Sequence, residues 1–313
     1  MMVSSGEAQS PHIPVLYQEI LDALQPQPGK RYVDCTLGAG GHAAGLLQAS
    51  APSGRLLGLD VDPGALAIAA KKLEAFGRRA HLVQASYTTL SVQLAALGWE
   101  HADGILLDLG ASSMQFDAPA RGFSFMQDGP LDMRFSPEGM LTAADIVNTW
   151  EQDELADILF KYGEERRSRQ IAGAIIQARP LHTTAQLADV IAKAAKGPKH
   201  SRLHPATLSF QALRIAVNAE MQAIESVLPQ ALAALAPHGR LAVISFHSLE
   251  DRIVKHFLRH HSRDQHNPHH PKNPVIEKAS IKLINRKPLL PTEEEIRQNP
   301  RARSAKLRVA EKL

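Results

Sequence analysis

Apolar residues along this chain form two patterns, short continuous runs typical of buried strands and longer amphipathic segments typical of helices. Five short runs, each ending in a polar or glycine-rich turn, lie at residues 33–36, 55–60, 80–85, 104–110 and 239–246. The run at residues 104–110 is so apolar that both faces of its strand must be covered, as in a parallel sheet. Because helical segments separate the first four runs, the sequence predicts an α/β fold with a doubly wound, mostly parallel sheet.

The alternation stops between residues 115 and 204, where amphipathic helices are predicted but no strand. These helices are expected at residues 143–150, 153–162, 165–178 and 184–195. A long helix is then expected at residues 205–235, and two late β segments at residues 276–284 and 304–310. The pattern predicts a discontinuous α/β domain, residues 1–114 and 205–313, with an inserted helical substrate-recognition domain, residues 115–204.

A strand–glycine loop–helix unit follows the first apolar run. Gly38, Gly40 and Ala43 fit the spacing G-x-G-x-x-G/A, which lets a nucleotide-like ligand approach the backbone. Asp60 ends the second run about 20 residues further on, where a carboxylate can accept both hydroxyls of a ribose. Glycine turns between a strand and a helix also occur for packing reasons alone, so the loop by itself leaves both explanations open.

Two cofactors bind to sheets of this kind, NAD and S-adenosylmethionine. NAD needs a loop that embraces its pyrophosphate, whereas S-adenosylmethionine has no phosphate and needs polar partners for its amino-acid end. Asp34 and His42 flank the glycines and can supply such partners. The late β segments also fit the class I S-adenosylmethionine-dependent methyltransferase layout better than a dehydrogenase. The sequence therefore favours S-adenosylmethionine.

The net charge of +3 conceals an asymmetry between two parts of the chain. Residues 252–313 carry a net charge of +9, and residues 1–251 carry −6. A basic segment on an otherwise mildly acidic enzyme indicates a polyanionic partner, nucleic acid first, with solubility as the alternative explanation.

The composition indicates a cellular compartment and argues against disulfide and metal chemistry. The single cysteine, Cys35, lies in the first predicted strand, where packing is a more common role than catalysis, and it excludes an intramolecular disulfide. No signal peptide and no membrane-spanning run is predicted, so we expect a soluble, cytoplasmic protein without a membrane partner. Five histidines lie within residues 260–273, but we expect this His- and Pro-rich segment to be a solvated loop and predict no metal.

Eight blocks of sequence, in one order, carry a family resemblance over nearly the whole chain. They are residues 12–16, 34–42, 103–113, 121–125, 130–134, 210–218, 245–252 and 299–308. These blocks resemble the RsmH (MraW) family of bacterial methyltransferases. The resemblance implies S-adenosylmethionine-dependent methylation of the exocyclic N4 amine of a cytidine in the decoding region of 16S ribosomal RNA. It also implies a small ribosomal subunit, or its assembly intermediate, as the partner.

The resemblance implies a set of cofactor contacts. They are Gly40, Gly41, His42, Asp60, Asp108, Gln115 and the residue after the third strand. That last position usually holds Phe in the family and holds Tyr87 here, and either ring can pack on adenine. Met114 and Phe116 replace the Pro and Leu that are usual beside Gln115, which makes this contact the weakest of the set.

Methylation of cytosine N4 requires help, because the lone pair of the amine is conjugated with the ring. An enzyme therefore needs hydrogen-bond acceptors for the amine protons and in-line positioning of the reactants. Asp108, Ser112, Ser113 and His247 are the candidate catalytic acceptors near the sheet edge. Asp108 can anchor the cofactor, accept from the amine, or do both. Ser248 and Asp251 fit the spacing of a helix capping box.

Substrate contacts are expected from two segments. Arg121, Phe123 and Phe125 combine a guanidinium with flat rings that can stack on a splayed base, although the two phenylalanines can equally anchor their loop to the core. Arg301 and Arg303 belong to the basic C-terminal segment. Two alternatives stay open, an RNA-binding or ribosome-assembly protein that only binds the cofactor, and a methyltransferase acting on another nucleic acid or on a protein.

Overall fold

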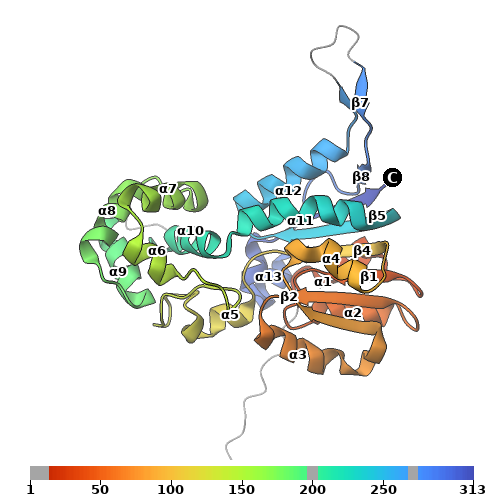
Figure 1. Ribbon diagram of the computed structural model, residues 1–313, viewed down its shortest axis with the longest axis horizontal. Coiled ribbons are helices and arrows are strands. Elements are labelled where there is room, and N and C mark those ends of the chain that lie inside the picture. The colour runs from red at the N-terminus through yellow and green to blue at the C-terminus, as the bar shows by residue number, and fades with distance from the viewer. Residues whose placement is uncertain (1–13, 196–203, 267–273) are drawn as a thin grey trace, which may run out of the picture. The chain divides into compact units, whose positions relative to one another are not determined.

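The computed structural model describes residues 14–195, 204–266 and 274–313. It divides into two compact units, one formed by Met1–Leu109 with Ser226–Leu313 and the other by Gly110–Glu225 (Figure 1). The chain thus leaves the first unit once and returns to it.

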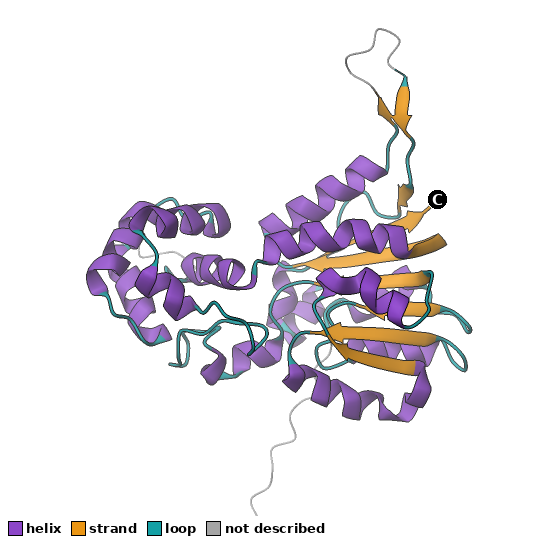
Figure 2. Cartoon of the chain, in the orientation of Figure 1, coloured by secondary structure: helices purple, strands orange, loops and turns teal. Residues whose placement is uncertain are grey.

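The first unit is built on a seven-stranded sheet with the order β3-β2-β1-β4-β5-β9-β8 (Figure 2). Its strands are β1 (Arg31–Asp34), β2 (Arg55–Asp60), β3 (Ala80–Gln84), β4 (Ala102–Asp108), β5 (Leu235–Ser245), β8 (Ile281–Leu283) and β9 (Lys306–Lys312). The first five are parallel, and β9 is antiparallel to both of its neighbours. This confirms the predicted doubly wound, mostly parallel sheet. The order reverses between β1 and β4, the point where ligands bind in such sheets.

Helices cover both faces of the sheet, with α1 and α2 behind it and α4 and α11 in front of it in Figure 1. The helices of this unit are α1 (Tyr17–Leu24), α2 (Gly41–Ala49), α3 (Pro63–Leu73), α4 (Leu90–Ala96), α12 (Ser248–His261) and α13 (Glu293–Gln298), together with most of α11 (Glu220–Ala234). Short 3₁₀ helices are η1 (Glu74–Arg79), η2 (Tyr87–Thr89) and η4 (Pro300–Ser304). The central strand β4 buries Ile105, Leu106 and Leu107 completely, which explains its uninterrupted apolar sequence.

The second unit is helical. It contains α5 (Ser113–Asp117), η3 (Pro119–Arg121), α6 (Ala143–Thr149), α7 (Gln152–Gly163), α8 (Ser168–Ala178), α9 (Thr184–Ala194) and α10 (Thr207–Asn218). Helix α7 packs against α8 and α10, and α9 packs against α8. The predicted insertion, residues 115–204, falls within this unit, which also includes α10 and the start of α11.

The single helix predicted at residues 205–235 is wrong, because the chain breaks it between α10 and α11. Ala219 has a φ of 48°, a left-handed conformation that ends α10. Just before the break, the Asn218 side chain donates to the Met133 carbonyl and accepts from the Phe135 N–H. The end of α10 is thereby tied to a loop of the same unit, and the periodic apolar pattern carries no sign of this bond.

The C-terminal region also differs from the prediction. The β segment predicted at residues 276–284 is two strands, β7 (Val275–Glu277) and β8, and β7 pairs with β6 (Gln265–His266). Helix α12 continues through His261, so the predicted loop begins later than residue 260. His269 and His270 lie outside the described residues. Among those that are described, no helix combines the length and apolar character required to cross a bilayer.

The predicted capping box of α12 is one residue out of register. His247 caps the helix by accepting from the Glu250 N–H, and the Glu250 side chain accepts from the His247 N–H in return. Asp251 instead accepts two hydrogen bonds from the Arg308 guanidinium on β9, at 2.7 and 3.2 Å. Burial acts to raise the pKa of Asp251, but these bonds and the charge of Arg308 prevail and lower it. The pair therefore fastens α12 to the sheet.

We expect Asp251→Ala to lower the free energy of unfolding by about 3–5 kcal/mol, because it leaves the nearly buried Arg308 guanidinium unpaired. Urea denaturation at neutral pH measures this. The double variant Asp251→Ala/Arg308→Met removes both charges and should recover part of the loss. A single variant that unfolds at the same urea concentration as the unmodified chain would contradict the structural role of the pair.

Candidate functional site

Three neighbouring strands of the sheet end in an aspartate. Asp34 ends β1, Asp60 ends β2 and Asp108 ends β4. Asp34 lies opposite Gly58 of β2 and Leu106 of β4 in the sheet register. The three carboxyl groups therefore lie at the same edge of the sheet, the one formed by the carboxyl ends of its parallel strands. The sequence predicts Asp60 and Asp108 at this edge, and predicts Asp34 only as a polar neighbour of the glycine loop.

Asp60 organises the glycine loop. The Gly38 N–H donates to Asp60 Oδ2 at 2.8 Å, and the Asp62 N–H donates to Asp60 Oδ1 at 2.9 Å. Burial raises the pKa of Asp60, and these backbone hydrogen bonds counteract it. Each carboxylate oxygen has two lone pairs, so both oxygens can still accept a further hydrogen bond from a ligand hydroxyl.

The glycines of the loop serve different purposes. A Cβ built on Gly40 would lie 3.2 Å from the Ala69 Cβ, and one on Gly41 would lie 2.4 Å from the Pro14 Cγ. Packing therefore excludes a side chain at Gly41 and crowds one at Gly40, whose φ of 74° also favours glycine. A Cβ on Gly38 would meet only the Thr36 carbonyl oxygen, at 4.0 Å, and the backbone there has a φ of 52°. Gly38, which belongs to the predicted glycine spacing but not to the predicted cofactor contacts, is thus the loop glycine whose backbone is open to a ligand.

Burial dominates the electrostatics of the edge. It raises the pKa of Asp34 to about 7, and the charge of Asp60 adds to the effect. Burial likewise raises the pKa of Asp108 far above its usual value, with Asp34 and Glu250 as further causes. Asp108 Oδ1 is buried and has no hydrogen-bond partner among the described residues. An edge with several carboxyl groups that resist ionisation is suited to a ligand that brings positive charge.

His42 is the second residue of α2, beside this edge, and is buried. Its Nε2 lies 3.0 Å from the Val15 carbonyl oxygen, which can only accept, so the proton of the neutral ring is on Nε2. The other nitrogen, Nδ1, lies 3.8 Å from Asp108 Oδ2. The Tyr17 ring stacks on the imidazole with centroids 6.3 Å apart. These contacts fix the ring with Nδ1 towards the carboxyl group of Asp108.

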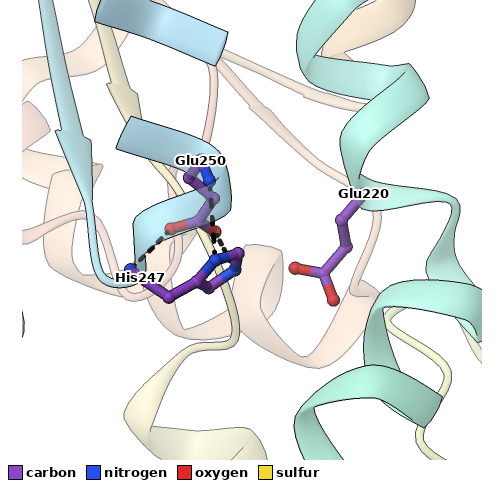
Figure 3. A group of neighbouring side chains, drawn as sticks. All are labelled: Glu220, His247 and Glu250. Atoms are coloured by element: carbon purple, nitrogen blue, oxygen red, sulfur yellow. Dashed lines mark hydrogen bonds and ion pairs between the residues drawn. The ribbon is translucent and has the colours of Figure 1, made fainter. Parts of the chain in front are cut away.

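His247 and Glu250 follow β5 at the same edge (Figure 3). Glu250 is fully buried, and its Oε2 accepts from the Phe246 N–H at 2.8 Å. His247 Nε2 lies 3.2 Å from Glu250 Oε1. The predicted catalytic residue His247 therefore has a structural role as the cap of α12. Sequence reasoning missed Glu250, although its position three residues after the cap was a usable signal. Glu220 of Figure 3 belongs to the helical unit, where it pairs with Arg214.

The remaining predicted cofactor and catalytic residues lie at the starts of two short helices, η2 and α5. Tyr87 is half-buried and opens η2, directly after the capping residue Ser86. In the helical unit, Ser112 and Gln115 form the capping box of α5, and Ser113 is its first residue. The Ser112 N–H donates to Gln115 Oε1 at 3.0 Å. The capping box thus gives Ser112 and Gln115 a structural use whatever else they bind.

The predicted base-stacking group is built into the helical unit. The Arg121 guanidinium donates to the carbonyl groups of Arg134 and Phe135 and lies over the Phe123 ring. Phe123 is buried and stacks on Phe135 with centroids 5.7 Å apart. Phe125 is half-buried and packs edge-on against Phe210. These contacts match the loop-anchoring alternative for both rings.

Arg301 and Arg303, the predicted contacts of the basic segment, are exposed side chains of η4 in the α/β unit. The 3₁₀ helix buries Ala302 between them and leaves both arginines exposed. Their position allows contact with a large partner.

Comparison with known proteins identifies the family of the chain. Residues 9–313 match the model of the MraW methylase family. A protein of Dehalococcoides mccartyi called ribosomal RNA small subunit methyltransferase H is 51% identical over 97% of this chain and 87% of its own length. Proteins of the same name from Heliobacterium mobile and Trichormus variabilis are 50% and 46% identical, over 96% and 99% of this chain and 99% and 94% of theirs. The chain therefore belongs to the MraW methylase family, whose methyl donor is S-adenosylmethionine.

Proposed function

We propose that this protein transfers the methyl group of S-adenosylmethionine to the N4 amine of one cytidine in the decoding region of 16S ribosomal RNA. The observation that carries the proposal is the family match over residues 9–313, joined to relatives of about 50% identity that are named small-subunit rRNA methyltransferases. The small ribosomal subunit, or an intermediate of its assembly, is the proposed partner in the cytoplasm.

The acidic edge of the sheet, formed by Asp34, Asp60 and Asp108 at the ends of β1, β2 and β4, fits the cofactor. Bound S-adenosylmethionine supplies a methyl group on a positively charged sulfonium. Asp60 has acceptor capacity left for two ribose hydroxyls, and the backbone at Gly38 is open. Asp34 and Asp108 offer negative charge to a cationic ligand, which would in turn favour their ionised forms. Tyr87 can offer its ring to adenine, and the predicted contact of Gln115 stays a prediction.

Asp108 is the proposed acceptor for the amine protons of the cytidine. Its Oδ1 is buried without a hydrogen-bond partner among the residues described, and such an atom gains most from a donor brought by a substrate. An N–H···O bond to the ionised carboxyl group would make the N4 lone pair more available, and positioning of the amine in line with the methyl group can contribute about 7–11 kcal/mol. The catalytic roles of Ser112, Ser113 and His247 stay predictions.

The state of Cys35 favours the nitrogen over ring carbon 5 as the methylated atom. Methylation of carbon 5 uses an attack of a thiolate on the pyrimidine ring. Cys35 is the single cysteine of the chain, is buried, and follows β1 directly. Burial first, and the charge of Asp34 second, raise the pKa of its thiol well above the usual value. A thiol in this state is a poor nucleophile, whereas the direct displacement at N4 needs none.

The proposed reaction predicts one product. Labelled S-adenosylmethionine is incubated with the full-length protein and small subunits from cells that lack the enzyme, and the rRNA is digested to nucleosides for mass spectrometry. We expect the label in N4-methylcytidine, and more of it from partly assembled subunits than from naked rRNA. Label in 5-methylcytidine, in an adenosine, or only in protein would refute the proposal.

A second prediction concerns Asp108. If it accepts from the reacting amine, Asp108→Asn lowers the single-turnover rate at saturating cofactor by about 10²-fold or more, while cofactor affinity falls by much less. Asp103→Asn is the matched control, because Asp103 lies near the opposite end of β4 and pairs with Lys30. A rate that saturating S-adenosylmethionine restores in full would remove Asp108 from the chemistry and leave it as a cofactor anchor.

A further inference from the structure

A surface cavity of about 120 Å³ lies on the α/β unit, between α12, the segment after β8, and β9. Its lining is strongly basic: Lys255, Arg259, Arg286, Lys287 and Arg308 surround it, with Asn285, Pro288, Leu258 and Leu283, and no acidic residue takes part. We call these five cations and their cavity the basic cavity. Lys255 and Arg259 are four residues apart on α12, so they share one face of the helix.

Four of the five cations have no counter-charge at ion-pair distance. Arg308 is neutralised by Asp251 behind the cavity. For Lys255, Arg259, Arg286 and Lys287, no carboxylate of the described residues lies within 4.0 Å. Four like charges around one hollow repel each other, and an anion placed among them relieves the repulsion.

The cavity is built on fixed backbone. The Asn285 side chain donates to the carbonyl groups of Lys287 and Leu307, at 2.9 and 2.8 Å, and accepts from the Val309 N–H at 2.7 Å. These bonds hold the segment that carries Arg286 and Lys287 against β9. On the other side, the Asp251–Arg308 pair holds α12 to the same strand. The backbone around the cavity therefore requires little ordering when an anion binds.

We propose that the basic cavity binds phosphate groups of the RNA backbone and holds the substrate strand beside the acidic edge of the sheet. The inference rests on the proposed function and extends it to a docking site. An extended polyanion suits this cavity better than a single small anion, because Arg259, Arg286 and Lys287 are exposed and can each contact a separate phosphate.

The position of the cavity in the sheet supports this assignment. Arg308 lies opposite Val243 of β5, and Val243 lies opposite Leu107, the residue before Asp108. Neighbouring strands are about 4.8 Å apart, so the backbone of Arg308 lies about 10 Å from that of Leu107. A nucleic acid strand carries a phosphate every 3.4 Å or so along a helix axis, so a strand of several nucleotides is long enough to run from Asp108 to the strand that carries Arg308.

The test compares two charge-removal variants of the full chain, Lys255→Gln/Arg259→Gln in the cavity and Lys71→Gln/Lys72→Gln on α3 as the matched control. Both remove two positive charges from exposed or half-buried helix positions. Binding of unmethylated small-subunit rRNA is measured by filter retention at several salt concentrations. The cavity variant should bind about tenfold more weakly. The slope of log K against log salt concentration should be less steep by about 1.4, which is about 0.7 for each lost phosphate contact. Binding of S-adenosylmethionine should stay unchanged.

Equal RNA affinity and equal salt dependence in the two variants would overturn the inference. Titration with pyrophosphate at constant ionic strength separates the two sources of phosphate. If pyrophosphate binding is lost in the cavity variant while RNA binding is kept, the cavity holds a small anion and the RNA assignment is wrong. The nucleoside product of the unmodified chain tests the proposed function independently of these variants. An N4-methylated product, together with unchanged RNA binding in the cavity variant, would refute this inference and leave the proposed function intact.

Discussion

Parallel pairing of β1, β2 and β4 is the constraint on which the candidate site depends. It places Asp34, Asp60 and Asp108 at one edge of the sheet, where burial makes each carboxyl group costly to ionise. One of them, Asp60, offsets part of this cost by accepting from the N–H of Gly38, and this bond shapes the loop that leads into α2. The fold and the site are therefore two results of the same strand order.

The glycines of the loop are required for different reasons, some for packing and one for access of a ligand to the backbone. Pro14 occupies the space in which a side chain at Gly41 would lie, and Gly40 combines a tight contact with Ala69 with a left-handed φ, whereas the space around Gly38 is open. A glycine motif read from sequence cannot separate these two reasons. The same holds for the aromatic loop of the helical unit, where Phe123 and Phe125 pack against other rings.

Most of the sheet could be predicted from the sequence, because buried parallel strands such as β4 leave continuous apolar runs. The details that failed depend on single hydrogen bonds between distant residues. Asn218 bonds to Met133 and Phe135 and marks the break after α10, and Asp251 pairs with Arg308 and not with the start of α12. Of the site, Asp60 and Asp108 could be located because each ends a strand. The raised pKa of Asp34 could not be predicted, since burial is set by the whole fold. Glu250 was missed although its position three residues after the helix cap is a sequence signal.

The central claim is that the buried acidic edge is matched to a positively charged cofactor. With the pKa of Asp34 raised to about 7, this carboxyl group is partly protonated at neutral pH, and a cation bound beside it should displace the proton. Calorimetric titration with S-adenosylmethionine at pH 7, in two buffers of different ionisation enthalpy, counts the protons exchanged. The account predicts net release of protons from Asp34 and Asp108, and less release with S-adenosylhomocysteine, which lacks the sulfonium charge. Equal proton exchange with the two ligands, or proton uptake with S-adenosylmethionine, would contradict it.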